Sequence, residues 1–188
     1  MVLDGSESRS DNNHEKSSRR TVKAPMRCSN PGGGPWLSSS QQRTRAAYLR
    51  VQLRMNYEIN RQLQRDNELS LADFHVLCAL SIAPNRKLQI SDLAAVICWE
   101  RSRLSHHLRR LCDRGLTERL QSEVDARATN VVLTEEGMSA IMAAAPGHAR
   151  LVRRLFFDPV PDELLSPFTA ALEHIQASLN SNSSLPPG

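Results

Sequence analysis

The chain has 188 residues, enough for one domain with a buried core, and its 24 Lys and Arg against 20 Asp and Glu leave a net charge of +4. Three of the basic residues are lysine and the other 21 are arginine, which suits forked contacts to phosphate and guanine edges. No apolar run reaches the roughly 20 residues that span a bilayer, the polar start does not match a signal peptide, and the four cysteines complete no zinc pattern. We therefore expect a cytoplasmic protein without a membrane segment, metal or cofactor.

The two ends of the chain differ in composition from the middle. Residues 1–34 are rich in Ser, Asn, Arg and Gly, and cannot bury enough apolar area to fold. The sequence therefore predicts a disordered tail over 1–34, a folded domain over 35–180 and a frayed C-terminus over 181–188.

Two helices with serine caps are predicted at the start of the domain. The first begins after a serine among residues 38–40 and runs to about Asn67, so its length requires a partner along it, in the same chain or in a second copy. Ser70 then caps a helix over residues 71–83. The buried side of this second helix would carry Leu71, Phe74, Leu77 and Leu80.

A short extended segment and two further helices follow. Residues 87–90 are extended, and Ser91 is expected to cap a helix over 92–98. The next helix follows the "WE" turn and ends at Gly115, a typical helix C-cap. Its leucines recur at i, i+4 and i+7, which places them on one stripe and leaves the opposite face polar. The packed residues would be Leu93, Val96 and Ile97 in the first of these helices and Leu104, Leu108 and Leu111 in the second.

Two strands with a polar tip are predicted next. The segments are 116–123 and 129–134, and the second has strong β propensity. Arg127 lies at the tip, where it could reach a DNA minor groove while Asp125 holds its guanidinium in place. A purely structural Asp–Arg pair in a tight turn is the alternative.

The last part of the domain is helical. Thr134 is expected to cap a helix that runs to about Phe157, with an interruption or kink at Pro146. A final helix would begin with Pro167 after a Ser166 cap. Its apolar positions are Leu172, Ile175 and Leu179.

This order of elements predicts a mostly α fold with a small β-wing. A winged helix-turn-helix over 70–134 is flanked by long helices over 36–67 and 135–180. In such a unit the second helix enters the DNA major groove. Residues 101–110 hold four arginines and no acid, but a charged helical face alone could simply be solvated. The predicted wing with Arg127 at its tip favours a DNA-binding face instead.

The sequence also resembles a known family. The segment 90–137 contains "SDLA", the serine-bearing "WERSRLSHH", "RGLTER", "DAR" and "LTEEG". Together these motifs resemble the MarR-type transcription regulators, in the form common in actinobacteria, and the resemblance extends from about Trp36 to Leu179. It implies a homodimer whose first helix and last two helices form the dimerisation region.

The resemblance also implies that two winged units read a palindromic site on double-stranded DNA. The protein would then be associated with the nucleoid in the cytoplasm. A residue at the position of His107 is usually turned inward in the family. Arg110 would face phosphate and Arg127 would be the wing arginine, supported by Asp125. The other expected DNA contacts are Arg101, Ser102, Arg103, Ser105, His106 and Arg109.

Members of this family often bind small aromatic acids or other lipophilic effectors where the dimer helices meet the DNA-binding part. By resemblance, such a ligand would release a repressor from DNA. Packing is the favoured interpretation of Trp99 and His75, and His148 could be a contact at a helix kink. The candidate lining residues are Arg45, as a carboxylate partner, with Tyr48, Met55, His75, Trp99 and His148.

Three other functions have weaker support in the sequence. Cys98 precedes the arginine-rich helix, which could activate its thiol for redox sensing, while Cys28 lies in the tail. A protein–protein adaptor on the same fold would have no need of the arginine face. An enzyme is not expected, because Ser105 and His106 point about 100° apart on a helix and no phosphate loop or hydrolase motif is present.

Overall fold

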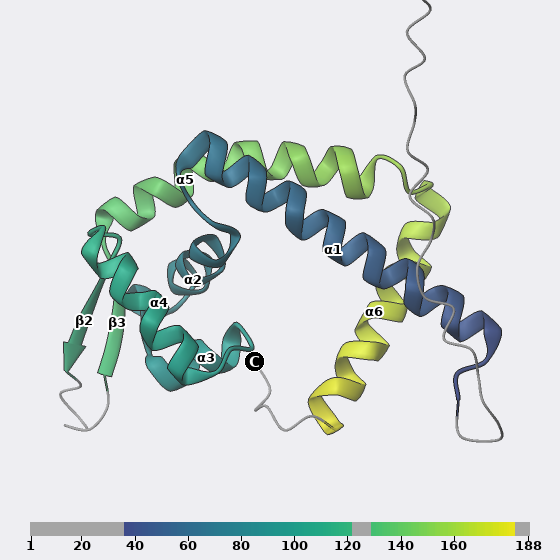
Figure 1. The fold of residues 1–188 in the computed structure, drawn as a ribbon, viewed down its shortest axis with the longest axis horizontal. Helices are drawn as coiled ribbons and strands as arrows, with labels where there is room; N and C mark the ends of the chain where they lie inside the picture. Colours follow the sequence, from purple (N-terminus) through teal and green to yellow (C-terminus); the bar gives the residue numbers. More distant parts are fainter. Residues whose placement is uncertain (1–35, 122–128, 183–188) are drawn as a thin grey trace, which may run out of the picture.

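A computed structural model describes residues 36–121 and 129–182. The described part of the chain is mostly helical, with one small antiparallel sheet. Figure 1 shows two long helices, α1 and α5, side by side. The helices and strands between residues 71 and 133 form a compact part at one end of this pair, and α6 descends from the other end. The predicted fold class, mostly α with a small β-wing, is confirmed.

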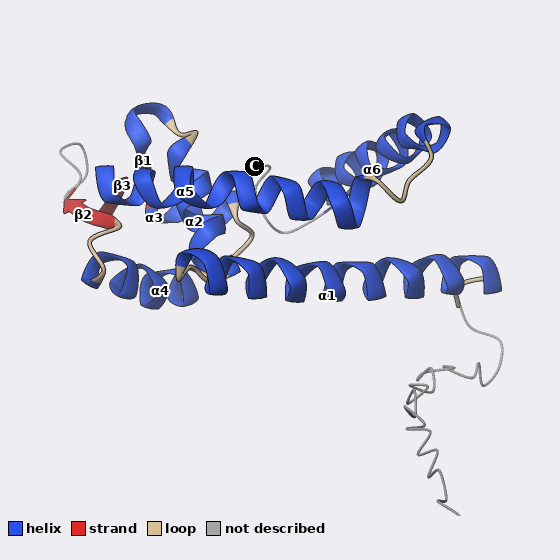
Figure 2. Ribbon diagram, turned by 90° about the horizontal axis from the view of Figure 1, so that it is seen from above, coloured by secondary structure: helices blue, strands red, loops and turns tan. Residues whose placement is uncertain are grey.

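Helix α1 (Ser39–Asn67) begins and ends where its caps predict. The Ser38 hydroxyl accepts a hydrogen bond from the Gln41 amide at 3.3 Å, and the Gln41 side chain accepts from the Ser38 amide at 2.8 Å. The helix packs along α5, and Figure 2 shows the pair from above. Within one chain it buries only Gln62 and Leu63, so most of its surface remains exposed.

Helix α2 (Leu71–Ser81) lies at the centre of the core. Ser70 caps it as predicted, in a reciprocal arrangement with Asp73. Phe74 is nearly buried, and Leu77 and Leu80 are fully buried. This apolar helix therefore supplies the surface on which the remaining elements of the compact part pack.

Helices α3 (Ile90–Val96) and α4 (Arg101–Asp113) form the predicted helix-turn-helix. In α4 the predicted stripe is confirmed, because the side chains of Leu104, Leu108 and Leu111 are all completely buried. The opposite face of α4 is exposed. The helix therefore presents its arginines to solvent from a rigid base.

The predicted start of α3 was wrong by two residues. The helix begins at Ile90 after Gln89, without a side-chain cap, and the Ser91 hydroxyl hydrogen-bonds the Asp92 carboxylate instead. Val96, predicted to pack, is exposed, and Ala94 is buried in its place. A helix of seven residues buries only a narrow stripe, so the small alanine meets the core.

Two turns of the same type bound α4. After α3, the Trp99 amide donates to the Ala94 carbonyl, with Cys98 left-handed at φ 55°. After α4, the Leu116 amide donates to the Leu111 carbonyl, with Gly115 at φ 70°. Both are Schellman motifs, whose left-handed position favours glycine. The first turn holds a cysteine there.

The sheet has the strand order β1-β3-β2, with β1 (Lys87–Gln89), β2 (Thr117–Gln121) and β3 (Thr129–Leu133) all antiparallel. The predicted strands are confirmed, while the polar tip lies outside the described residues. Gly137 lies against the start of β2, where a Cβ atom would come within 2.2 Å of the Leu116 carbonyl oxygen. The sheet and the next helix therefore pack too closely for a side chain at that position.

Helix α5 (Glu135–Val152) leads from the last strand of the compact part toward the final helix. The Thr134 hydroxyl accepts a hydrogen bond from the Gly137 amide at 3.0 Å, as its capping role predicts, and donates to the Gly115 carbonyl at 2.7 Å. The helix continues through Pro146. Its hydrogen-bond pattern changes at the π-helical segment Arg153–Phe157, so the predicted interruption falls later than expected.

The predicted start of the last helix was also wrong. Helix α6 (Asp162–Asn182) begins before Ser166, and Pro167 lies within it. Asp162 and Glu163 occupy its first turn, where acidic side chains favour a helix N-terminus. Pro167 is the sixth residue of the helix, so its ring removes the hydrogen bond that an amide there would donate to the Glu163 carbonyl. The helix ends at Asn182, beyond the predicted end at 180, and buries none of its residues.

Candidate nucleic-acid interface

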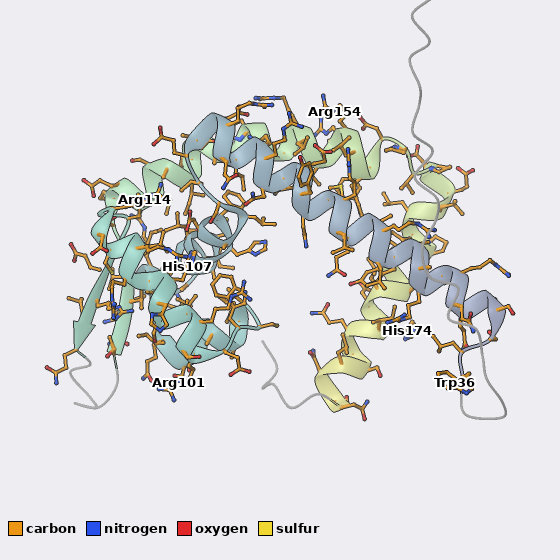
Figure 3. The ribbon with its side chains drawn as sticks, in the orientation of Figure 1. Trp36, Arg101, His107, Arg114, Arg154 and His174 are labelled. Carbon is orange, nitrogen blue, oxygen red and sulfur yellow. The ribbon has the colours of Figure 1, made fainter. Side chains whose placement is uncertain are left out.

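The exposed face of α4 carries most of the predicted DNA contacts. Figure 3 shows Arg101 at the lower edge of the helix, directed away from the body of the molecule. Ser105 is half-buried. The exposed members of the predicted set are Arg101, Ser102, Arg103, His106, Arg109 and Arg110.

Two of these arginines have no polar partner in the described part of the chain. Arg101 and Arg109 form no hydrogen bond or ion pair with any other described residue. Asp113, in the last turn, is the only acidic residue of α4. The guanidinium groups are therefore available to an external anion, and a phosphate backbone is the anion that matches several arginines on one helix.

Arg103 is held over an aromatic ring. Its guanidinium carbon lies 4.1 Å from the centroid of the Trp99 ring, in a cation–π contact. Trp99 belongs to the turn before α4 and packs partly against the core. The tryptophan therefore limits the rotamers of Arg103.

A buried carboxylate ties α4 to α2. Asp73 Oδ1 lies 2.8 Å from His107 Nε2, and Asp73 Oδ2 accepts from Arg114 Nη1 at 3.2 Å and from the Ser70 amide at 2.8 Å. Arg114 also donates to the Glu68 carbonyl at 2.9 Å. Figure 3 shows His107 and Arg114 on the side of α4 toward the body of the molecule. The arrangement fixes the rotation of α4 about its axis.

The ionisation of Asp73 reflects these contacts. Burial raises its pKa, but the contact with His107 and the hydrogen bonds with Ser70 outweigh burial and lower the pKa to about 2. The carboxylate is therefore charged at neutral pH. It offers a negative group beneath a helix whose outer face is positive.

A third connection comes from the sheet. Arg119 of β2 donates through Nη2 to the Ser105 carbonyl at 2.6 Å. The strand that leads to the wing is therefore fixed to the middle of α4. Sequence reasoning missed Arg119, Arg114 and Asp73, because their partners lie far apart in the chain. Only the S-x-x-D pattern at Ser70 signalled a role for Asp73, as a cap.

Known structures share this fold, with up to 31% sequence identity among those compared. The chain matches the MarR family over residues 69–129. AbsC, a MarR family transcriptional regulator from Streptomyces coelicolor, is 31% identical, with a TM-score of 0.73 over 79% of this chain and 100% of that chain. The chain belongs to the MarR family. A comparison with curated proteins found no match.

Two further structures similar to this MarR family protein were solved with DNA. Sco3205, a MarR family regulator from S. coelicolor in complex with DNA, is 30% identical, with a TM-score of 0.74 over 80% of this chain and 98% of that one. A mutant MarR from E. coli complexed with operator DNA is 22% identical, with a TM-score of 0.63 over 70% of this chain and 91% of that one, and supports the fold alone. The two Streptomyces matches agree with the predicted actinobacterial branch. The protein is a transcriptional regulator of this family.

The wing residues of the MarR protein remain predictions. Asp125 and Arg127 lie outside the described residues, while β2 and β3 flank their segment.

The predicted ligand-binding residues are spread over several elements. Arg45 and Tyr48 are exposed on α1, and Trp99 contacts α4. His75 of α2 and His148 of α5 interact electrostatically; burial lowers the pKa of each, and His148 lowers that of His75 further. The His148 ring also lies 4.8 Å from that of Phe74. The sixth residue, Met55, lines a separate groove.

That groove lies between α1 and the π-helical segment and has a volume of about 570 Å³. Its apolar lining includes Met55 and Leu155. Arg50, Arg54 and Arg154 surround them, and Arg54 forms an ion pair of 2.7 Å with Glu58. Apolar walls with surplus positive charge match an amphipathic anion.

The described cysteines differ in exposure. Cys98 is exposed, whereas Cys78 and Cys112 are partly buried, and burial raises the pKa of the Cys78 thiol. All three are free, and Cys28 lies outside the described residues.

None of the described helices is both long and apolar enough to cross a membrane.

Proposed function

We propose that the chain is a homodimeric transcriptional repressor that reads a palindromic DNA site and is released by a small-molecule ligand. The observation that carries DNA recognition is the row of exposed arginines on α4, of which Arg101 and Arg109 have no partner among the described residues. A helix presented in this way is suited to the major groove. The relative Sco3205 was solved in complex with DNA, which supports the same role here.

The proposed DNA contacts differ in which part of the DNA their chemistry matches. Arginine forks and the His106 ring match guanine acceptors, and the serine hydroxyls match phosphates or base edges. Arg110 faces a phosphate, and Arg127, supported by Asp125, reaches the minor groove. The proposed contacts on α4 are Arg101, Ser102, Arg103, Ser105, His106, Arg109 and Arg110.

Exposed apolar residues support the homodimer. Large apolar side chains remain exposed along α1 and on every turn of α6, in a chain whose compact part has a closed core. A second copy that packs its own terminal helices against them would remove this surface from water. The most exposed members are Tyr48, Leu53, Tyr57, Leu164, Ile175 and Leu179.

The groove beside Met55 supports the effector. A small aromatic or lipophilic acid would place its apolar body on Met55 and its carboxylate near Arg50 or Arg154. Binding there would change the position of α1 relative to α5, and so the spacing of the two recognition helices in a dimer. Arg45, Tyr48, His75, Trp99 and His148 stay as further candidates for effector contact.

Selection of random duplex DNA with the full chain tests the proposal. We expect an enriched palindrome with half-sites about one helical turn apart, and an affinity that falls steeply with salt. Arg109→Ala should weaken binding to the selected site by about tenfold, while Arg61→Ala, on the exposed surface of α1, should leave it unchanged. The proposal fails if no sequence is enriched, or if both variants lose the same affinity.

A further inference from the structure

His107 has a set of contacts that a packing residue does not need. Its side chain is 7% exposed, on the inner side of α4. Nε2 lies 2.8 Å from Asp73 Oδ1, and Nδ1 lies 2.8 Å from Arg110 Nη2. Its ring also meets the Trp99 ring edge-to-face, with centroids 5.3 Å apart. One buried imidazole therefore touches an anchor in α2 and supports two neighbours of the DNA-binding face.

The contact with Arg110 fixes the tautomer of the ring. A guanidinium can only donate hydrogen bonds, so Nδ1 must present a lone pair. The ring hydrogen is then on Nε2, which faces the Asp73 carboxylate. The imidazole thus accepts at Nδ1, while Nε2 lies at ion-pair distance from the Asp73 carboxylate, and the ring connects the buried carboxylate to an exposed arginine.

Each partner of the histidine also has another way to satisfy its polar atoms, although His107 is the main contact that keeps the buried Asp73 carboxylate charged. Asp73 already accepts hydrogen bonds from Ser70 and Arg114. Arg110 is exposed and would be solvated without a protein partner. A leucine at this position would fill the space next to Leu104 and Leu111 without burying polar atoms. A histidine differs from a leucine here in two ways: it keeps a contact with the Asp73 carboxylate, and it fixes the Arg110 side chain.

We propose that His107 is a positioning residue that holds Arg110 in place for a DNA phosphate, with Asp73 as its anchor; this rests on the proposed DNA-binding function. A free arginine loses rotamer freedom when it binds, and a side chain already fixed loses less. Through Trp99 the same ring supports the platform under Arg103. His107 therefore acts on affinity without touching DNA.

A double-mutant cycle on the selected DNA site tests the role. His107→Leu should weaken binding by about tenfold in the full chain, but by no more than about twofold in an Arg110→Ala background. Arg101→Ala is the matched control: Arg101 lies on the same helix without contact to His107, so the two losses should multiply. Urea unfolding of each variant shows whether the chain is folded at the temperature of the binding measurement.

The conservative variant and the tautomer provide independent readouts. Gln can accept from Arg110 with its oxygen and donate to Asp73 with its nitrogen, so His107→Gln should restore most of the affinity and the coupling to Arg110. Nitrogen NMR of the unmutated protein near neutral pH should show the hydrogen of His107 on Nε2. This measurement does not require the leucine variant to fold.

The outcomes separate the two proposals. If the unmutated chain selects no DNA site, the proposed function fails and the positioning role fails with it. If it binds, but His107→Leu costs the same factor with and without Arg110, the histidine is structural only. A hydrogen on Nδ1 would overturn the positioning role directly.

Discussion

The compact part and the terminal helices place similar leucines in opposite environments. In α4, Leu104, Leu108 and Leu111 are completely buried within one chain. In α6, Leu172 and Leu179 recur at a comparable helical spacing but are 41% and 59% exposed. Both stripes predict an amphipathic helix equally well. A stripe alone therefore does not tell whether its partner lies in the same chain.

The difference lies in what surrounds each stripe. Helix α4 is flanked by α2, α3 and β2, and polar contacts from Asp73 and Arg119 fix its rotation. Helix α6 follows a π-helical segment and a turn, and its one described ring contact is Phe168 with Phe156. The compact part thus contains its own core, whereas the apolar residues of α6 stay exposed within the chain, as the proposed homodimer requires.

The largest expected effect comes from charging the α6 stripe. Ile175→Asp with Leu179→Asp should raise the dimer dissociation constant by about a hundredfold or more, because each copy loses two apolar contacts and gains two charges there. Sedimentation at micromolar concentration measures the change. Gln176→Asp adds a charge to an exposed polar position of the same helix and should leave the dimer intact. A dimer unaffected by the double substitution would show that α6 is not the interface.

A second prediction concerns the stability of the compact part at low pH. The pKa of Asp73 is about 2 in the folded chain against an ordinary value of 3.8, so its contribution to stability is present above pH 4 and lost as pH falls toward 2. The shift corresponds to about 2 kcal/mol. Urea unfolding followed by Trp99 fluorescence, in a Trp36→Phe background, should show this loss.

Asp73→Asn provides the control for the acid measurement. This variant is less stable at neutral pH, and its stability should change less between pH 4 and 2. Equal pH dependence in both proteins would mean that other carboxylates govern acid unfolding.

The smallest expected effect concerns the two turns around α4. Cys98 holds the left-handed position that Gly115 holds in the second turn, and Cys98 is exposed, so Cys98→Gly removes strain without loss of packing. We expect a gain of about 0.5–1 kcal/mol in the free energy of unfolding. Gly115→Ala should cost a similar amount through φ alone, because no atom lies within 4 Å of its Cβ position. Destabilisation by Cys98→Gly would show that the thiol contributes to the turn.

Local signals predicted most of the fold. Ser38, Ser70 and Thr134 each cap the helix that the sequence assigns to them, because a cap acts on amides within three residues. The two wrong helix starts, at Ser91 and Ser166, had the same signal. In both cases the chain becomes helical earlier, so the serine falls inside the helix.

Only the exposed face of α4 in the candidate DNA-binding site could be predicted from the sequence. The exposed arginines of α4 follow from periodicity, since they lie opposite a leucine stripe. Their anchors do not, because the contact between Asp73 and Arg114 joins residues 41 positions apart. The inward direction of His107 came from family resemblance, and its partners became visible only in three dimensions.

The Thr134 hydroxyl has a mechanical consequence. One oxygen caps α5 and also holds the carbonyl at the end of α4, while Gly137 packs against Leu116 too closely for any side chain. The end of α4 and the start of α5 can therefore turn only as one body. A tilt imposed on the far end of α5 would be transmitted over the whole length of that helix. It would change the orientation of the arginines on α4 without deforming α4 itself.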